Sequence, residues 1–225
     1  MDKYIFVSEK SWNIDGLKIL IDHKLGEWIL INNKDVFNKG FIDKIKPKKI
    51  FIPHWSYIIP EEIFLSYECI VFHMTDLPFG QGGSPLQNLI ERKIYQTKVS
   101  ALKVLSELDS GPIYLKEELS LWGNAEEIYL RSNAVIISMI VNIIENNLKP
   151  IPQVGTILKF KRRKPEQSNI SDLKELEVIF DYIRMLDAEG YPKAFMEIGD
   201  FRYEFSRASI KSDKSIIADV RIFKK

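Results

Sequence analysis

Residues 69–87 read CIVFHMTDLPFGQGGSPLQ, and the fold and the candidate site both depend on this stretch. The apolar run from Cys69 to Phe72 predicts a buried strand that ends at His73. A loop with three glycines in four positions follows, from Gly80 to Gly83. Because glycine has no Cβ atom, the backbone of such a loop can approach a ligand closely. The junction of strand and loop is therefore the first place to expect a site.

The chain around this stretch alternates short apolar runs with helical patterns over its first 150 residues. This alternation is typical of βα units on a mostly parallel sheet, whose ligands bind at the carboxyl ends of the strands. Further strands are predicted at residues 4–7, 28–31, 49–52, 95–105 and 113–119, with helices at 14–23 and 61–65. Two capping boxes, Ser84 with Gln87 and Asn124 with Glu127, predict helices from 85 to about 92 and from 125 to 145.

The texture changes after residue 147, where prolines, a glycine and the basic run from Lys159 to Lys164 follow one another. We therefore predict an α/β catalytic domain over residues 1–150 and a small α+β subdomain over residues 151–225. The subdomain is expected to contain a helix at 173–186 and antiparallel strands after residue 191.

The overall charge gives little attraction to a polyanion. The 32 basic and 31 acidic residues leave a formal net charge of +1, so no global field draws the protein to nucleic acid or to an anionic membrane. The single cysteine, Cys69, lies in an apolar run and predicts a buried thiol in a reducing compartment. Without a signal-peptide pattern or about 18 consecutive uncharged apolar residues, the expected location is cytoplasmic.

Two catalytic candidates stand out, although each has an ordinary structural explanation. His73 ends a strand beside a glycine loop, and Asp109 opens the turn Asp109-Ser110-Gly111-Pro112. A lone histidine is as often a hydrogen-bonded core residue, and an aspartate in a turn often caps the local backbone. The glycine loop has neither the lysine of a phosphate-binding P-loop nor the GxGxxG of a dinucleotide site. The three histidines and the carboxylates show no metal-binding spacing, so no metal is expected.

In order and spacing these pieces resemble the folate-dependent formyltransferases. The shared features are the strand ending at His73, Leu77-Pro78 with the glycine loop, and Leu108-Asp109-Ser110-Gly111. The loop from Trp55 to Pro60 resembles the family's pterin-binding loop, and residues 162–168 resemble a segment of the sugar-modifying members. The resemblance covers nearly the whole chain and implies a Rossmann-like formyltransferase core. It also implies that 10-formyltetrahydrofolate is the co-substrate.

The resemblance implies specific roles for residues on the carboxyl edge of the sheet. His73 holds the proton that stabilises the oxyanion or takes it from the attacking amine, and Asp109 orients its ring. The folate would contact two loops, at Trp55, Ser56, Tyr57 and Ile58 and at Leu105, Glu107 and Leu108. The acceptor would contact Lys10, Trp12, Gln81, Gly82 and Gly83, although Lys10 and Trp12 fit an exposed lysine and a half-buried tryptophan equally well.

One residue departs from the family pattern: Val71 stands where the family has an asparagine. That amide helps to hold the formyl oxygen as it gains negative charge, and losing one such donor costs about 10²–10³ in rate. We expect backbone amides of the Gly80 to Gly83 loop to replace it, with the hydroxyl of Thr75 or an impaired site as alternatives.

The acceptor is expected to be an amino sugar linked to a nucleotide. The expected partners of the protein are therefore small molecules, with no nucleic acid and no membrane, and a homodimer is compatible with these expectations. A large basic carboxyl-terminal domain would grip a tRNA, and the tail here is short. Two alternatives remain: formylation of an aminoacyl group on tRNA or on a carrier protein, and a non-catalytic binder of folate or nucleotide sugar.

Overall fold

A computed structural model describes all 225 residues, which form two compact units. The first comprises residues 1–82, 97–119 and 130–159, and the second comprises residues 83–96, 120–129 and 160–225. The units interleave along the chain, whereas the sequence predicts one boundary at residue 150. The domain boundary at residue 150 therefore remains a prediction.

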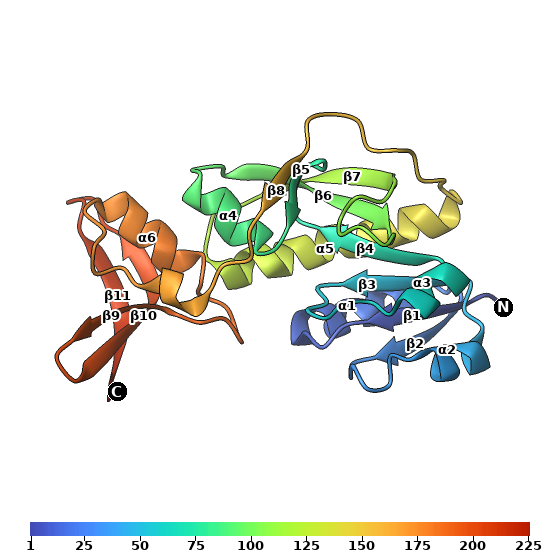
Figure 1. Cartoon of the computed structure of the whole chain (residues 1–225), viewed down its shortest axis with the longest axis horizontal. Coiled ribbons are helices and arrows are strands. Elements are labelled where there is room, and N and C mark those ends of the chain that lie inside the picture. Colours follow the sequence, from blue (N-terminus) through green and yellow to red (C-terminus); the bar gives the residue numbers. More distant parts are fainter. The chain divides into compact units, whose positions relative to one another are not determined.

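The first unit contains a six-stranded sheet in the order β2-β1-β3-β4-β6-β7 (Figure 1). Its strands are β1 (Lys3–Val7), β2 (Glu27–Ile31), β3 (Lys49–Pro53), β4 (Cys69–His73), β6 (Gln96–Lys103) and β7 (Ile113–Ser120). The strands β1 to β4 are parallel, and β6 runs antiparallel to β4. The predicted mostly parallel α/β core is confirmed.

Apolar side chains cover both faces of the parallel part of this sheet, which explains why β1, β3 and β4 are mostly continuous apolar runs rather than alternating ones. On one face Ile5, Val7 and Ile52 pack in a single cluster with residues of α2 (Lys39–Ile45) and α3 (Glu61–Ser66). On the other face the rings of Tyr4, Trp28 and Phe51 pack at tilted angles, with 5.1–6.0 Å between centroids.

The helices α1 (Ser11–Asp22) and α5 (Ala125–Glu145) approach each other closely at Gly16. A Cβ atom on Gly16 would lie 2.7 Å from the amide of Asn133, and that amide donates to the carbonyl of Trp12 at 2.8 Å. Figure 1 shows α5 running along β4, β6 and β7. By length and composition α5 is apolar enough to cross a membrane, but half of its most apolar stretch is buried inside the protein.

The two predicted capping boxes have different outcomes. Asn124 and Glu127 exchange hydrogen bonds of 2.9 and 2.8 Å at the start of α5, as expected. Ser84 makes no cap bond to α4 (Pro85–Glu91), because it lies in the left-handed region with φ 54°. Its hydroxyl instead accepts from the backbone of Arg163 at 3.1 Å.

The glycine-rich segment is a strand rather than the predicted loop. Residues Phe79–Gly82 form β5, which pairs with β8 (Leu158–Phe160). Positive φ angles of 80° at Gly80 and 109° at Gly82 explain why glycine is needed there.

The carboxyl-terminal part of the second unit holds a three-stranded antiparallel sheet in the order β11-β10-β9. The elements of this carboxyl-terminal part are η1 (Pro165–Ser168), α6 (Leu176–Arg184), β9 (Ala194–Ile198), β10 (Phe201–Ile210) and β11 (Ile216–Lys224). These elements confirm the predicted α+β character of the carboxyl-terminal subdomain, with a helix shorter than the expected 173–186.

Candidate active site

His73 lies at the carboxyl end of β4 and is held by oxygen atoms at both ring nitrogens. Its Nε2 lies 2.7 Å from the carbonyl oxygen of Gly80, and its Nδ1 lies 3.6 Å from Oδ2 of Asp109. The His73 and Asp109 side chains are each only 10% exposed. A backbone carbonyl can only accept, so the contact with Gly80 places a proton on Nε2, whereas the Asp109 carboxylate faces Nδ1 beyond hydrogen-bond distance.

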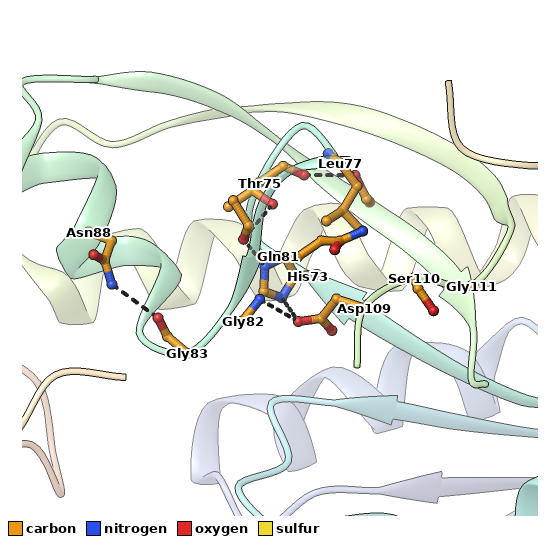
Figure 2. A network of polar contacts seen from close by, with 12 residues as sticks. His73, Thr75, Leu77, Gln81, Gly82, Gly83, Asn88, Asp109, Ser110 and Gly111 are labelled. Carbon is orange, nitrogen blue, oxygen red and sulfur yellow. Dashed lines mark hydrogen bonds and ion pairs between the residues drawn. The ribbon is translucent and has the colours of Figure 1, made fainter. Parts of the chain in front are cut away.

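Asp109 is brought to His73 by an unusual backbone conformation and by the glycine strand. Its φ angle is 54°, in the left-handed region that few residues other than glycine adopt. Its Oδ2 also accepts a 2.9 Å hydrogen bond from the backbone N–H of Gly82. Figure 2 shows His73, Gly82 and Asp109 converging on one point. Thus β5 orients the two catalytic candidates, with a carbonyl for His73 and an N–H for Asp109.

These contacts change the role expected for the glycine segment. The N–H of Gly82 is used to bind Asp109, so one of the loop amides that were expected to hold the oxyanion already has an acceptor. A Cβ atom on Gly83 would lie 2.6 Å from Cβ of Arg162, so close packing explains this glycine. The alternative donor, Thr75, is fully buried, and its hydroxyl lies 3.4 Å from the Gly80 carbonyl.

The turn that carries Asp109 is clamped by Gln153, a residue that sequence reasoning did not identify. The amide nitrogen of Gln153 lies 2.7 Å from the carbonyl of Asp109 and 2.8 Å from that of Gly111. Since both carbonyls only accept, this end of the side chain is the NH₂ group. Its oxygen then accepts from Gln81 Nε2 at 3.1 Å, which leaves the buried Oε1 of Gln81 without a hydrogen-bond partner. No local signal could have found Gln153, because it lies 44 residues from Asp109.

Val71, at the departure from the family pattern, packs in the apolar cluster of β1, β3, α2 and α3. Trp55 and Val104 pack against the same cluster. The two segments expected to bind folate are therefore anchored on the apolar surface that contains Val71. An amide at this position would have to satisfy its polar atoms beside an aliphatic cluster.

The expected folate-contacting residues are mostly exposed. Tyr57, Ile58, Leu105 and Leu108 are 44%, 85%, 44% and 61% exposed. Ser56 is also exposed, and Glu107 forms a surface ion pair of 2.9 Å with Lys159. Trp55 is half-buried, edge-on to Phe37 and to Tyr57. Exposed apolar side chains on two loops offer a surface that a flat ring can cover.

The candidate acceptor residues Lys10 and Trp12 lie together beyond the end of β1. The ammonium group of Lys10 lies 5.5 Å from the centroid of the buried Trp12 ring. The edge of Trp12 meets His54, with 6.1 Å between centroids. His54 directly follows β3, and its φ angle of 48° turns the chain there. Burial, with a smaller contribution from the charge of Lys10, lowers the pKa of His54 to about 4. Sequence reasoning did not single out this neutral histidine.

The buried thiol of Cys69 is not a nucleophile at neutral pH. Burial raises its pKa to about 12, so the thiolate is scarce. The prediction of a buried cysteine is confirmed.

Comparison with known proteins places the chain in a family. Residues 165–223 match a family model described as the C-terminal domain of methionyl-tRNA formyltransferase. A solved structure described as methionyl-tRNA formyltransferase from Clostridium thermocellum is 49% identical, covers 100% of both chains and has a TM-score of 0.97. The chain therefore belongs to the formyltransferase family that includes the methionyl-tRNA formyltransferases, which confirms the expected class of enzyme.

Two further relatives define how far the likeness extends. A curated methionyl-tRNA formyltransferase from Ehrlichia ruminantium (strain Gardel) is 29% identical over 189 residues, which are 81% of this chain and 61% of the relative. The chain thus spans less than two thirds of that relative. HypX from Aquifex aeolicus, solved with tetrahydrofolic acid, shares the fold at 16% identity and a TM-score of 0.75, over 91% of this chain and 37% of HypX.

Two expectations about the acceptor are wrong. The family model and the relatives from Clostridium thermocellum and Ehrlichia ruminantium are named for methionyl-tRNA, whereas a sugar N-formyltransferase from Shewanella sp. FDAARGOS_354 shares only the fold, at 14% identity and a TM-score of 0.69. The preference for a nucleotide-linked amino sugar and the exclusion of nucleic acid are both overturned. Both rested on net charge and tail length, and net charge does not reveal where basic side chains gather.

Proposed function

We propose that this protein transfers a formyl group from 10-formyltetrahydrofolate to the amino group of an aminoacyl-tRNA, with methionyl-tRNA as the acceptor. The observation that carries the proposal is the 49% identity over the full length of both chains to the Clostridium thermocellum methionyl-tRNA formyltransferase. The folate is supported by the family and by the tetrahydrofolic acid in HypX, which has the same fold. The predicted cytoplasmic location is consistent with such an enzyme.

The reaction is an acyl transfer that needs no covalent enzyme intermediate. The neutral amine attacks the formyl carbon, a new C–N bond forms, and the oxygen gains negative charge. The bond from carbon to the folate nitrogen then breaks, and one proton passes from the amine to that nitrogen. The enzyme must align the two reactants, stabilise the oxyanion and move this proton.

His73 supplies the proton donor for the oxyanion in this proposal. The Gly80 carbonyl at 2.7 Å requires an N–H at Nε2, and the Asp109 carboxylate 3.6 Å from Nδ1 would stabilise a positive charge on the ring, which would in turn stabilise the developing negative charge. Asp109 balances the charge of the ring and fixes its orientation. In the complex the formyl oxygen competes with the Gly80 carbonyl for the N–H at Nε2.

The imidazolium offers an answer to the missing asparagine. A charged donor makes a hydrogen bond about twice as strong as a neutral one. One N⁺–H from His73 can therefore supply much of what an amide would add, without a polar group at Val71. The folate ring is proposed to lie on Trp55, Tyr57, Ile58 and the loop from Leu105 to Leu108.

The direct test is turnover with two classes of acceptor. The protein is incubated with 10-formyltetrahydrofolate and either methionyl-tRNA or a panel of nucleotide-linked amino sugars, and products are analysed by mass. We expect formylmethionyl-tRNA, with no gain of formyl mass on the sugars and none on tRNA with the His73→Ala variant. Formylation of a sugar, or folate binding without any turnover, would contradict the proposal.

A further inference from the structure

The carboxyl-terminal sheet has one open edge, formed by β11. This strand has nine residues and a single neighbour, β10. The opposite edge is shorter and covered: β9 has five residues, and Phe195 on it is bridged by Asn169 and accepts a 2.8 Å hydrogen bond from Ile170 N–H. Natural sheets usually protect a long edge with proline, a bulge or a covering segment.

β11 carries charged side chains but neither a proline nor a bulge. The irregularity in this sheet lies on β10, where Arg207 has a φ angle of 51° and its N–H binds Asp187 at 2.7 Å. The run Ile216–Lys224 is unbroken, so alternate N–H and C=O groups along it point away from β10. Such an edge is a template for another strand.

Apolar side chains along the edge are exposed on one face of the sheet. Val220 and Ile222 are two residues apart in the strand and therefore lie on the same face, where they are 47% and 56% exposed. In register they stand beside Phe205 and Tyr203 of β10. The apolar surface therefore reaches the edge and stops there, which is the pattern expected where a sheet continues into a neighbour.

The charges of β11 identify the neighbour, because they are complementary to themselves. Asp219 and Arg221 flank Val220 and point to the opposite face. If two β11 strands pair antiparallel with Val220 at the two-fold axis, each Asp219 stands opposite Arg221 of the other strand. Glu204 already faces Arg221 from β10, so the charges would alternate Glu204, Arg221, Asp219 across the junction. The present contact of Asp219 with Arg207 is exposed and contributes little.

We propose that β11 is a self-association edge, through which a second copy of this chain pairs antiparallel about Val220 to make a continuous six-stranded sheet. The apolar face then runs unbroken through Val220 of both copies, and two reciprocal Asp219 to Arg221 pairs set the register. Such an isologous contact closes on itself and gives a dimer rather than a fibre. Because two paired edge strands are small beside a standard interface of about 800 Å² per partner, we expect a dimer that dissociates in the micromolar range.

The test is a charge swap in the full chain, measured by sedimentation velocity between about 1 and 100 µM. Asp219→Arg and Arg221→Asp each place like charges opposite each other twice, so each is expected to raise the dimer Kd at least tenfold. The double variant Asp219→Arg/Arg221→Asp restores opposite charges in this register and is expected to recover the wild-type Kd. Val220→Lys sets two ammonium groups together at the axis and should abolish the dimer.

The matched control is Ile198→Lys, which places a lysine on β9, at the other edge of the same sheet and at a site 58% exposed. It should leave the dimer unchanged. Thermal unfolding of each variant shows whether the fold is kept. A wild-type chain that stays monomeric at 100 µM overturns the proposal. So does a dimer Kd that is unchanged in both single charge reversals, or a double variant that does not recover the wild-type Kd. None of these outcomes depends on the formyl-transfer activity.

Discussion

At the scale of single residues, the chemistry rests on how Asp109 is held. Its Oδ2 receives Gly82 N–H at 2.9 Å and faces His73 Nδ1 at 3.6 Å. In Asp109→Asn the amide oxygen can still accept from Gly82, so the geometry survives while the negative charge is lost. We expect kcat for formyl transfer to fall by at least about 10², with the thermal midpoint nearly unchanged. Ser110→Ala, next in the turn, is the control, and a change confined to KM would show that Asp109 only shapes the folate pocket.

His54 gives a second prediction at this scale, concerning stability against pH. Its pKa is about 4 in the folded protein and near 6.5 when unfolded, so between these values the unfolded chain binds the extra proton. The contribution of the neutral His54 side chain to the free energy of unfolding is constant above about pH 6.5. The free energy of unfolding falls as the pH drops from about 6.5 toward 4. The loss is of the order of 2 kcal/mol. Denaturant titrations of wild type and His54→Gln should diverge over this window, and identical pH slopes would rule out the burial effect.

Val71 also belongs at this scale. The valine in place of the family's asparagine was visible in the sequence. The residues that surround Val71 were not, because they come from β3, α2 and α3. Restoring the amide with Val71→Asn places polar atoms beside the apolar cluster and should cost about 1–3 kcal/mol in unfolding free energy. If the variant is instead as stable as wild type and gains much activity, His73 alone does not supply the missing stabilisation of the oxyanion.

At the scale of elements, the segment after α5 reaches back to the active-site turn through Gln153. Gln153→Leu removes the hydrogen bonds to the carbonyls of Asp109 and Gly111, so the Asp109 side chain is then held mainly by the N–H of Gly82. We expect kcat to fall about tenfold with little change in the KM for folate, because a misplaced carboxylate affects the transition state most. Gln153→Glu keeps the size but not the donors and should behave alike. Wild-type kcat in both variants would show that the turn around Asp109 keeps its conformation without Gln153.

The same scale shows what sequence can predict about this fold. The parallel strands and α5 could be predicted because long apolar runs and a complete capping box are local signals. The strand β5 could not, since Gly80 and Gly82 disfavour strands and pair only because β8, from far along the chain, lies beside them. His73 and Asp109 were identified by local motifs, whereas Gln153 and His54 act through contacts between distant segments.

At the scale of the whole molecule, a net charge of +1 requires that any tRNA be met by a local basic surface. Residues 161–164 read KRRK, and Lys161, Arg162 and Lys164 are exposed, whereas Arg163 is mostly buried and paired with Glu91 at 2.7 Å. These three exposed cations, directly after β8, are our candidates for contacting phosphates of the acceptor.

The last prediction follows from this arrangement. If the three cations neutralise phosphates, Lys161→Ala/Arg162→Ala/Lys164→Ala should raise the KM for methionyl-tRNA by roughly tenfold or more at low salt and leave the KM for folate unchanged. Each lost phosphate contact also reduces the slope of log KM against log salt by about 0.7–0.9, so the slope should fall by about 2 to 3. Lys211→Ala/Lys214→Ala removes exposed lysines between β10 and β11 and serves as the control. Equal slopes in wild type and triple variant would place the tRNA on another surface, whereas a fall in kcat with the same KM would mean that the segment supports the active site rather than the acceptor.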